Sequence, residues 1–482
     1  MIKALTTDLY QLTMAQAYTV NGITNLEACF YLHFRENPFK GGYSVACGLT
    51  QILEFIDSFQ FTDADCSYLS TLNTSAGKPL FKPEFIENLS KMKLAIDLDA
   101  VLEGTVVFPN EPVIRVRGPI IQCQLIETAL LNLFNFETLI ATKAARICEV
   151  ARGPVAEFGL RRAQGPAGGL LASRAAFVGG CSSTSNIEAG KVFSLPVSGT
   201  HAHSWVMAHD SELEAFRSYA SVFPHDTTLL VDTYDTLKGV ANAIVVAKEM
   251  EGRKERLAGI RIDSGDLAWL SIQARRLLNE AGLDYVRIIA SNDLDEYTIQ
   301  SLHEQKACID MWGVGTKLAT AWDKPALTGV YKLSATRRAE GEPWTPQIKV
   351  SDQVFKTTLP GLLAARRFVD SDGIYVGDMV YDEQLPPQDG LIIDSQDELR
   401  RKDLTGFEFF ELLQPCVRKG ALVCKPQTAY EAQQNTRENL RHLHPTNKRL
   451  LNPHSYPVGL EKKMLKQRGE IIRRVKGLTD IG

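Results

Sequence analysis

Two neighbouring segments carry a high density of groups that can hold an anion. The first, FGLRRAQGPAGG, contains Arg161 and Arg162, whose planar guanidinium groups match the oxygens of a carboxylate or a pyrophosphate. The second, SGTHAHSW, contains Thr200, His201 and His203, and a neutral imidazole can accept a proton or a phosphoryl group. Together the two segments predict a site that holds a multiply charged anion beside such an acceptor.

The elements that must position these groups are strands alternating with helices. Between Thr227 and Leu318, the apolar runs LLVDTYDT, GIRIDSGD, VRIIASND and IDMWGVGT are separated by segments with helical periodicity. This alternation predicts parallel βα units, in which a ligand lies at the carboxyl ends of the strands. A further strand, VAEFGLRR, is expected before them, and on such a strand only one of Arg161 and Arg162 would point inward.

Polar residues follow each of these predicted strands. Asp and Gly also cap helices and end strands without any functional role, but four successive polar strand ends favour one active-site face. The residues concerned are Asp232, Asp235, Asp263, Asp266, Ser291, Asn292, Asp293, Gly313, Gly315 and Thr316.

The flanking segments predict a second unit. Residues 1–135 contain short β runs separated by Pro and Gly, and similar runs in residues 330–430 suggest that the chain returns to complete this unit. Residues 136–330 then form the α/β catalytic domain, entered through a long helix near 121–150. Residues 431–482 are expected to form a helical, basic segment, with solvated surface helices as its simplest interpretation.

The composition sets limits on function. The chain has 482 residues, 44% of them hydrophobic, with a net charge of −4, which is typical of a globular enzyme and disfavours a dedicated nucleic-acid binder. Nine scattered cysteines without a close CxxC pair suggest reduced thiols in the cytoplasm. Neither a signal peptide nor a membrane span is predicted, because the apolar runs are too short.

Five motifs in order, TDLYQLTMAQAY, FGLRRAQGP, SGTHAHSW, RIDSGDL and WGVGTKL, make most of residues 5–335 resemble the nicotinate phosphoribosyltransferase family. The resemblance implies an α/β fold: an irregular TIM-like barrel with a β-rich α+β domain built from the N- and C-terminal segments. It also implies a homodimer with shared active sites. The implied reaction makes nicotinate mononucleotide from nicotinate and phosphoribosyl pyrophosphate, coupled to ATP hydrolysis through a phosphohistidine, with Mg²⁺ as cofactor.

The resemblance implies roles for individual residues. His203 matches the phosphorylated position, whereas His201 falls at a position that the family pattern leaves open. Tyr10 would stack on the pyridine ring and Arg35 would reach the pyrophosphate, both from the partner subunit. Arg161 and Arg162 are placed near the active centre.

The remaining candidates follow from the chemistry of the transfer, which needs anion clamps, a diol holder and a metal. Asp263 would hold the ribose hydroxyls or Mg²⁺, and Arg261, on the same strand face, is the candidate for the nicotinate carboxylate. Backbone N–H groups at the later strand ends would bind the 5′-phosphate. Those strand ends are Ser291, Asn292, Gly313, Gly315 and Thr316.

The choice of base depends on Ser185. Nicotinamide-using relatives have an aspartate at the approximately matching place, so a neutral serine favours the acid over the amide. A nicotinamide-using enzyme nevertheless remains an alternative, and a quinolinate-using one a weaker alternative.

Two other classes of function stay open. His201, His203, His209, His225 and Asp263 superficially resemble the metal ligands of barrel amidohydrolases, although at least one predicted barrel strand precedes the HxH motif here. A non-catalytic phosphosugar-binding protein would use the same anion sites without needing His203.

Overall fold

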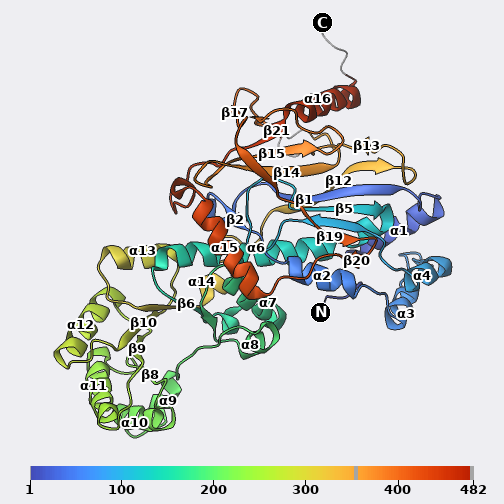
Figure 1. The fold of residues 1–482 in the computed structure, drawn as a ribbon. Helices are drawn as coiled ribbons and strands as arrows, with labels where there is room; N and C mark the ends of the chain where they lie inside the picture. Colours follow the sequence, from blue (N-terminus) through green and yellow to red (C-terminus); the bar gives the residue numbers. More distant parts are fainter. Residues whose placement is uncertain (1, 352–356, 478–482) are drawn as a thin grey trace. The chain divides into compact units, whose positions relative to one another are not determined.

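The computed structural model describes residues 2–351 and 357–477. The chain divides into two compact units, residues 1–139 together with 326–482, and residues 140–325. The sequence-based boundaries at 135 and 330 lie close to this division. Figure 1 labels the elements of both units, and helix α6 (Glu127–Ala151) contains the boundary between them.

The first unit contains a seven-stranded sheet in the order β13-β12-β1-β5-β3-β19-β20. Every pairing in it is antiparallel, and strands from the later part of the chain flank the N-terminal strands β1, β5 and β3 on both sides. Strand β1 is buried along nearly its whole length, because both of its faces are covered. The strands are β1 (Glu27–Phe34), β3 (Asp97–Ala100), β5 (Ile114–Pro119), β12 (Gly329–Arg337), β13 (Thr345–Pro346), β19 (Gln414–Arg418) and β20 (Ala421–Leu422).

A six-stranded sheet belongs to the same unit, in the order β17-β16-β21-β15-β14-β18. An apolar cluster packs Tyr31 of β1 against Val380, Leu460 and Met464 of this sheet and its following helix, so the two sheets share a core. The strands are β14 (Leu363–Val369), β15 (Tyr375–Asp382), β16 (Leu391–Ile393), β17 (Arg401–Asp403), β18 (Glu408–Glu411) and β21 (Val458–Glu461).

Helices and a two-stranded sheet of β2 (Ser44–Val45) and β4 (Val106–Val107) complete this unit. The helices are α1 (Leu9–Val20), α2 (Leu49–Asp57), α3 (Asp63–Thr71), α4 (Pro83–Ser90), α5 (Ile120–Leu125), α15 (Ala429–His442) and α16 (Lys462–Lys476). Residues 431–482 were expected to be helical, but they also contain strand β21.

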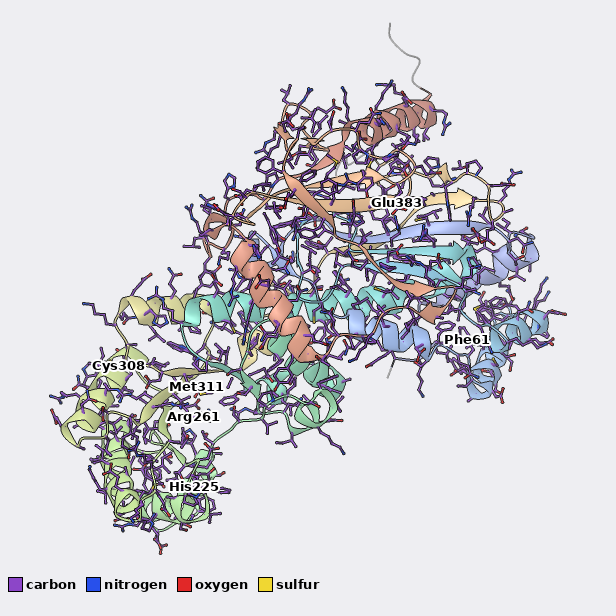
Figure 2. All side chains as sticks on the ribbon, viewed as in Figure 1. Phe61, His225, Arg261, Cys308, Met311 and Glu383 are labelled. Carbon is purple, nitrogen blue, oxygen red and sulfur yellow. The ribbon has the colours of Figure 1, made fainter. Side chains whose placement is uncertain are left out.

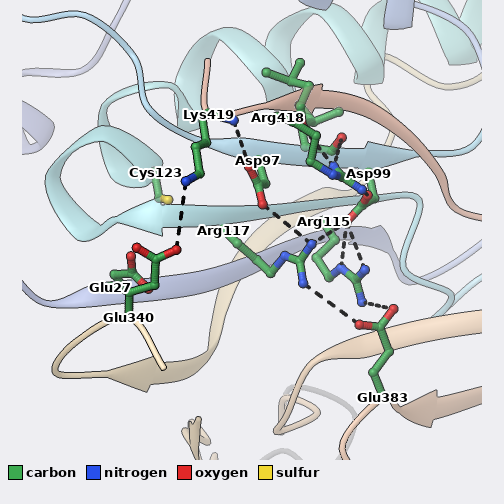
Figure 3. A network of polar contacts seen from close by, with 12 residues as sticks. Glu27, Asp97, Asp99, Arg115, Arg117, Cys123, Glu340, Glu383, Arg418 and Lys419 are labelled. Atoms are coloured by element: carbon green, nitrogen blue, oxygen red, sulfur yellow. Dashed lines mark hydrogen bonds and ion pairs between the residues drawn. The ribbon is translucent and has the colours of Figure 1, made fainter. Parts of the chain in front are cut away.

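A network of charged residues joins strands from distant parts of the sequence (Figure 3). Asp99 of β3 accepts a hydrogen bond from Nη2 of Arg115 on β5 at 2.9 Å and another from Arg418 on β19. Arg115 also pairs with Glu383 at 2.8 Å. Burial alone would raise the pKa of Asp99, but the surrounding arginines outweigh it and hold this pKa below its usual value. The network thus fastens C-terminal strand β19 to N-terminal strands.

A fully buried ion pair joins Arg367 and Asp378, register partners on β14 and β15. Their Nη2 and Oδ2 atoms lie 2.6 Å apart, and the Tyr456 hydroxyl also donates to Asp378. We expect Asp378→Asn to lower the free energy of unfolding by about 3–5 kcal/mol, because Arg367 would keep a buried charge without its partner. Urea unfolding measures this loss. Asp372→Asn in an exposed turn is the control, and a loss equal to the control's would contradict the expectation.

His33 on β1 makes the stability of the first unit depend on pH. Its side chain is 8% exposed, and burial, with smaller effects from Arg35 and Lys332, lowers its pKa to about 3. The unfolded chain therefore binds a proton at His33 near pH 6.5, whereas the folded chain does not until about pH 3. Its contribution is fully present above pH 6.5 and falls by about 1.4 kcal/mol per pH unit below it.

We expect His33→Phe to weaken this acid sensitivity, since the ring is kept and the titrating nitrogens are lost. Urea unfolding at pH 7, 6, 5 and 4 compares the slope of unfolding free energy against pH. The exposed His225, replaced by Gln, serves as the control and should leave the slope unchanged. Equal slopes for the His33→Phe and wild-type chains would count against this assignment.

The second unit contains a six-stranded sheet in the order β7-β6-β11-β10-β9-β8. All of its ladders are parallel, which confirms the predicted βα arrangement. In the part of the unit that the structure describes, no ladder joins edge strands β7 and β8, so the barrel remains a prediction. The strands are β6 (Val155–Glu157), β7 (Ser183–Thr184), β8 (Thr228–Leu230), β9 (Gly259–Ile262), β10 (Arg287–Ser291) and β11 (Met311–Val314).

Helices follow these strands, as the periodicity predicted. They are α7 (Gly165–Val178), α8 (Ile187–Phe193), α9 (His203–Met207), α10 (Glu212–Val222), α11 (Thr236–Gly252), α12 (Leu267–Glu280), α13 (Glu296–Glu304) and α14 (Thr316–Ala319). Asp235, Asp266 and Asp295 accept N–H bonds at the starts of α11, α12 and α13. Asp235 and Asp266 therefore cap helices, the structural alternative considered for polar strand ends.

The predicted strand VAEFGLRR is wrong in its second half. Strand β6 ends at Glu157, and Leu160–Arg162 form a 3-10 turn. The Glu157 carboxylate accepts the Gly159 N–H, which turns the chain there. A Cβ at position 159 would lie 2.3 Å from that of Ala319, so the turn requires glycine. The two arginines thus do not alternate along a strand.

Two findings bear on the compositional predictions. Among the described residues, no helix is long and apolar enough to cross a membrane. None of the nine cysteines forms a disulfide in the described part of the chain.

Candidate active site

A cavity of about 330 Å³ lies in the second unit, at the carboxyl ends of β6, β8 and β9. It brings together groups from both opening motifs and from RIDSGDL. Its lining residues are Phe158, Leu160, Arg161, Ser185, Gly199, Thr200, His201, Ala202, His203, Leu230, Arg261 and Asp263.

Arg261, labelled in Figure 2, is held on three sides at the end of β9. Its Nε donates to Ser291 Oγ at 2.7 Å, Nη1 to Thr200 Oγ1 at 3.0 Å and Nη2 to Asp263 Oδ1 at 2.8 Å. Its guanidinium carbon lies 5.6 Å from the centre of the Phe158 ring. These contacts fix a permanent positive charge in the cavity wall and leave further N–H groups to donate to a ligand.

Asp263 follows β9 and is positioned by the neighbouring strand ends. Its backbone N–H donates to Asp232 Oδ2 at 3.0 Å, and the Ser264 hydroxyl donates to the same oxygen at 2.6 Å. Ser291 donates to Asp263 Oδ1. These bonds engage the backbone N–H and Oδ1 of Asp263. The other carboxylate oxygen, Oδ2, lies 4.0 Å from His203 Nε2.

His203 begins helix α9 and is partly exposed. Its Nδ1 lies 3.2 Å from Thr233 Oγ1, and its Nε2 lies 4.0 Å from Asp263 Oδ2. Thr233, and not Asp232 or Asp235, lies beside this nitrogen, because Asp232 supports Asp263 and Asp235 caps α11. One ring nitrogen is thus held by a hydroxyl while the other faces a carboxylate.

His201 is buried and makes contacts within the fold. Its Nε2 accepts the Leu230 N–H at 3.1 Å, so Nδ1 carries the proton and lies 3.3 Å from the Ala202 carbonyl oxygen. Burial lowers the pKa of His201, which keeps the imidazole neutral. Its bond to Leu230 fastens the SGTHAHSW loop to β8.

The amidohydrolase alternative requires His201 and His203 to converge on a metal with Asp263. His201 Nε2 is already used by Leu230, and His209 Nδ1 lies 2.8 Å from the Trp205 carbonyl oxygen. Among the described residues, these histidines and Asp263 do not form a group with the closeness of metal ligands. The geometry therefore disfavours this alternative.

Glu157 shapes the opposite wall of the cavity, and we did not single it out from the sequence. Its buried carboxylate accepts hydrogen bonds from Ser173 at 2.9 Å, from Thr184 at 2.6 Å and from the Gly159 N–H. It thereby holds both the turn that carries Arg161 and the segment that carries Ser185. The available signal was an acidic residue inside the predicted apolar strand VAEFGLRR.

The other predicted site residues lie in several places. Arg162 is exposed and is not among the residues that line the described cavity. Ser291 is not among the lining residues, but it makes hydrogen bonds to Arg261 and Asp263, which are. Asn292 is exposed with a φ of 103°, which is unusual for a residue other than glycine.

Gly313 lies in β11 and pairs with Ser291 in the sheet, whereas Gly315 and Thr316 follow that strand. A Cβ at Gly313 would lie 2.7 Å from the Phe158 ring, so this glycine makes room for a cavity-lining side chain. Gly315 and Thr316 begin the short helix α14. These three residues are not among the lining of the described cavity.

Tyr10 and Arg35 belong to the first unit, on α1 and directly after β1. Tyr10 is half exposed, which is compatible with contact to a ligand or another chain.

Some residues that line the cavity were not predicted from the sequence. They are Phe158, Leu160, Gly199, Ala202 and Leu230. Small and apolar residues carry little signal by type, although Phe158 and Gly199 lie inside the quoted motifs.

Three family models match the chain. The nicotinate phosphoribosyltransferase N-terminal domain matches residues 5–135, the family model residues 154–374, and the C-terminal domain residues 364–468. The nicotinate phosphoribosyltransferase of Bacillus subtilis (strain 168) is 44% identical over 481 residues, covering 98% of this chain and 96% of the relative. That of Homo sapiens is 33% identical over 524 residues, covering 96% and 95%.

Solved structures agree with these matches. The crystal structure of human nicotinic acid phosphoribosyltransferase has a TM-score of 0.84 at 30% identity, covering 96% of this chain and 99% of that one. Nicotinate-nucleotide pyrophosphorylase from Pyrococcus furiosus, at 22% identity and a TM-score of 0.69, shares the fold. From its sequence matches and its fold, the chain belongs to the nicotinate phosphoribosyltransferase family.

Proposed function

We propose that this chain transfers the phosphoribosyl group of 5-phosphoribosyl 1-pyrophosphate to nicotinate, forming nicotinate mononucleotide and pyrophosphate in NAD biosynthesis by salvage. The observation that carries the proposal is Arg261, fixed by three hydrogen bonds beside Asp263 in the wall of the cavity. The names and extents of the relatives support the same reaction.

The transfer breaks the bond between C1 of ribose and the pyrophosphate oxygen while the pyridine nitrogen bonds to C1. Positive charge develops on the sugar, so the protein must position two reactants and stabilise charge. Asp263 Oδ2 is available to accept hydrogen bonds from the ribose hydroxyls and to lie near the developing cation. Asp232 and Ser291 hold Asp263 in place for this role.

The nicotinate carboxylate needs a fixed cation, and Arg261 and Arg161 are the arginines that line the described cavity. Arg261 is pre-organised, whereas Arg161 lies on an exposed turn, which suits a role at the cavity mouth toward pyrophosphate. The Phe158 ring offers an apolar face for the pyridine. Ser185, in the lining, is neutral and does not repel a carboxylate.

ATP coupling is part of the proposal. The γ-phosphoryl group of ATP would pass to a ring nitrogen of His203, releasing ADP, and water would later cleave the phosphorus–nitrogen bond. A phosphate carries close to two negative charges near neutral pH, and Asp263 lies 4.0 Å from His203. Phosphorylation would therefore alter the electrostatics of the sugar site and its affinity for phosphoribosyl pyrophosphate.

Mg²⁺ fits the oxygen donors at this site, since Asp263 Oδ2 faces the cavity and Mg²⁺ prefers carboxylate ligands. Bound there, the ion would supply neutralisation of the pyrophosphate charge. Backbone N–H groups of Asn292, Gly313, Gly315 and Thr316 remain the proposed 5′-phosphate site. The proposal also includes a cytoplasmic location and a barrel-like curvature of the parallel sheet.

The proposed assembly is a homodimer in which Tyr10 and Arg35 of each chain complete the partner's site. Refolding Tyr10→Ala chains together with His203→Ala chains tests this arrangement, and the readout is the ATP-stimulated activity that each variant alone is expected to lack. Recovered activity supports shared sites, and its absence contradicts them.

The experiment for the reaction follows mononucleotide products by chromatography, with Mg²⁺, phosphoribosyl pyrophosphate and either nicotinate or nicotinamide, each with and without ATP. Nicotinate mononucleotide that increases with ATP is the expected result. Product from nicotinamide alone would instead indicate the amide-using branch. The absence of product with either base would overturn the proposal.

A further inference from the structure

A second cavity, of about 460 Å³, lies wholly within the first unit. Tyr31 and His33 of β1 form part of its wall, together with residues of β15, β21 and α16. Its volume falls in the range of small-molecule sites. None of the motifs on which the proposed reaction rests contributes a residue to the lining of this cavity. His33 lies two residues before Arg35 in the sequence.

Two deeply buried side chains in the wall each have one nitrogen without a hydrogen-bond partner among the described residues. Arg468 of α16 is 9% exposed and His33 is 8% exposed. The Nε of Arg468 and the Nδ1 of His33 make no hydrogen bond within the described part of the chain. A buried guanidinium N–H without an acceptor is costly, so the protein itself does not fully compensate the positive charge of Arg468.

Further donors line the same cavity. Tyr31 accepts the Leu359 N–H at 3.0 Å, which leaves its own O–H proton to donate. The Arg400 guanidinium and the Asn110 amide are also in the lining. Burial lowers the pKa of Arg468, because the smaller opposing effects of Tyr31 and Glu398 do not offset it.

A loop between β16 and β17 shapes one side of the cavity. Asp394 Oδ1 accepts the backbone N–H groups of Gln396 and Asp397, and Arg468 Nη1 donates to the Ser395 carbonyl oxygen at 3.2 Å. These contacts fix Asp394 and Asp397 in the lining, where their other carboxylate oxygens can accept hydrogen bonds from hydroxyl groups. The wall thus offers cations and acceptors together.

We propose that this cavity binds a small phosphorylated metabolite, with its phosphate on Arg468 and Arg400 and its hydroxyl groups on Asp394 and Asp397. A phosphate uses several donors at once, and the carboxylates would disfavour a simple anion without donors of its own. A sugar phosphate has both kinds of group and suits the volume. This site is separate from the reaction proposed above and does not depend on it.

Ribose 5-phosphate is the probe, titrated calorimetrically into the full-length chain. The active-site variant Asp263→Ala reduces interference from the first cavity, because it removes the proposed acceptor for the ribose hydroxyls there. We expect ribose 5-phosphate to bind this variant, and the further substitutions Arg468→Gln or Arg400→Gln to weaken binding about tenfold or more. Arg474→Gln, exposed on the same helix, is the matched control and should leave binding unchanged.

Arg400 is exposed, so its substitution tests the site even if Arg468→Gln disturbs folding. Binding that is lost with Asp263→Ala alone would assign the sugar phosphate to the active-site cavity and overturn the proposal. Affinity unaffected by Arg400→Gln and Arg468→Gln, or no binding of ribose 5-phosphate to any variant, would also overturn it. Failure of the nucleotide-forming assay would leave this result unaffected, since the titration contains no base and no ATP.

Discussion

In the His203→Ala protein, ATP no longer accelerates formation of nicotinate mononucleotide. The substitution removes the ring nitrogens that would accept the phosphoryl group, while Asp263 and Arg261 keep their hydrogen bonds to Ser291. Coupling free energies between sites are typically about 1–3 kcal/mol, so kcat/KM for phosphoribosyl pyrophosphate with ATP should fall about 5- to 150-fold. The rate without ATP should change far less.

The measurement pairs steady-state kinetics with labelling from ATP carrying ³²P at the γ position. Label should enter the wild-type chain and not the His203→Ala chain. His209→Ala is the matched control, because His209 lies close to His203 in the sequence but its Nδ1 contacts the Trp205 carbonyl oxygen. Label or ATP stimulation that persists in the His203→Ala chain would refute the role of His203.

The largest loss is expected for Arg261→Gln. Glutamine lacks the positive charge and cannot make the three bonds to Ser291, Thr200 and Asp263. Bonds to charged groups contribute about 1.5–3 kcal/mol each. Loss of two such interactions with nicotinate predicts a decrease in kcat/KM of about 1,000-fold.

Arg261→Lys separates charge from geometry. Lysine keeps the charge but not the planar fork, so it should recover only part of the activity. The exposed Arg253, replaced by Gln, controls for a general loss of positive charge. Kinetics with nicotinate varied measure the effect, and thermal unfolding checks that each variant is folded. Full activity in the Arg261→Lys chain would show that the fork is unnecessary.

The sequence predicted the parallel part of the fold well, because each buried strand is a short apolar run that ends in polar residues. Helix α12 lies between the runs GIRIDSGD and VRIIASND, where helical periodicity was predicted. The boundary of β6 was missed because the turn depends on Glu157, whose carboxylate bonds to the Gly159 N–H and to side chains from two later segments. Long-range contacts of this kind leave no local pattern.

The same limit applies to the site. Thr200, His203, Arg261 and Asp263 were found from residue type and position, and the structure brings them into one cavity wall. The part played by Thr233 beside His203 was not foreseen, because a threonine after a strand is common. Neither was the second cavity, whose walls come from β1, the Asp394 loop and α16, segments with no shared motif.

The pairing of N-terminal strands with much later strands in the seven-stranded sheet has a consequence for synthesis on the ribosome. Strand β1 pairs with β5 soon after it emerges, but its other neighbour, β12, begins at Gly329. At about 5–20 residues per second, the roughly 300 intervening residues take about 15–60 s. During that interval one edge of β1 is open to pairing with other chains, while the contiguous unit 140–325 can already fold. Chaperones that protect the nascent chain should therefore matter most for the first unit, whose N-terminal part is made well before residues 326–482 complete it.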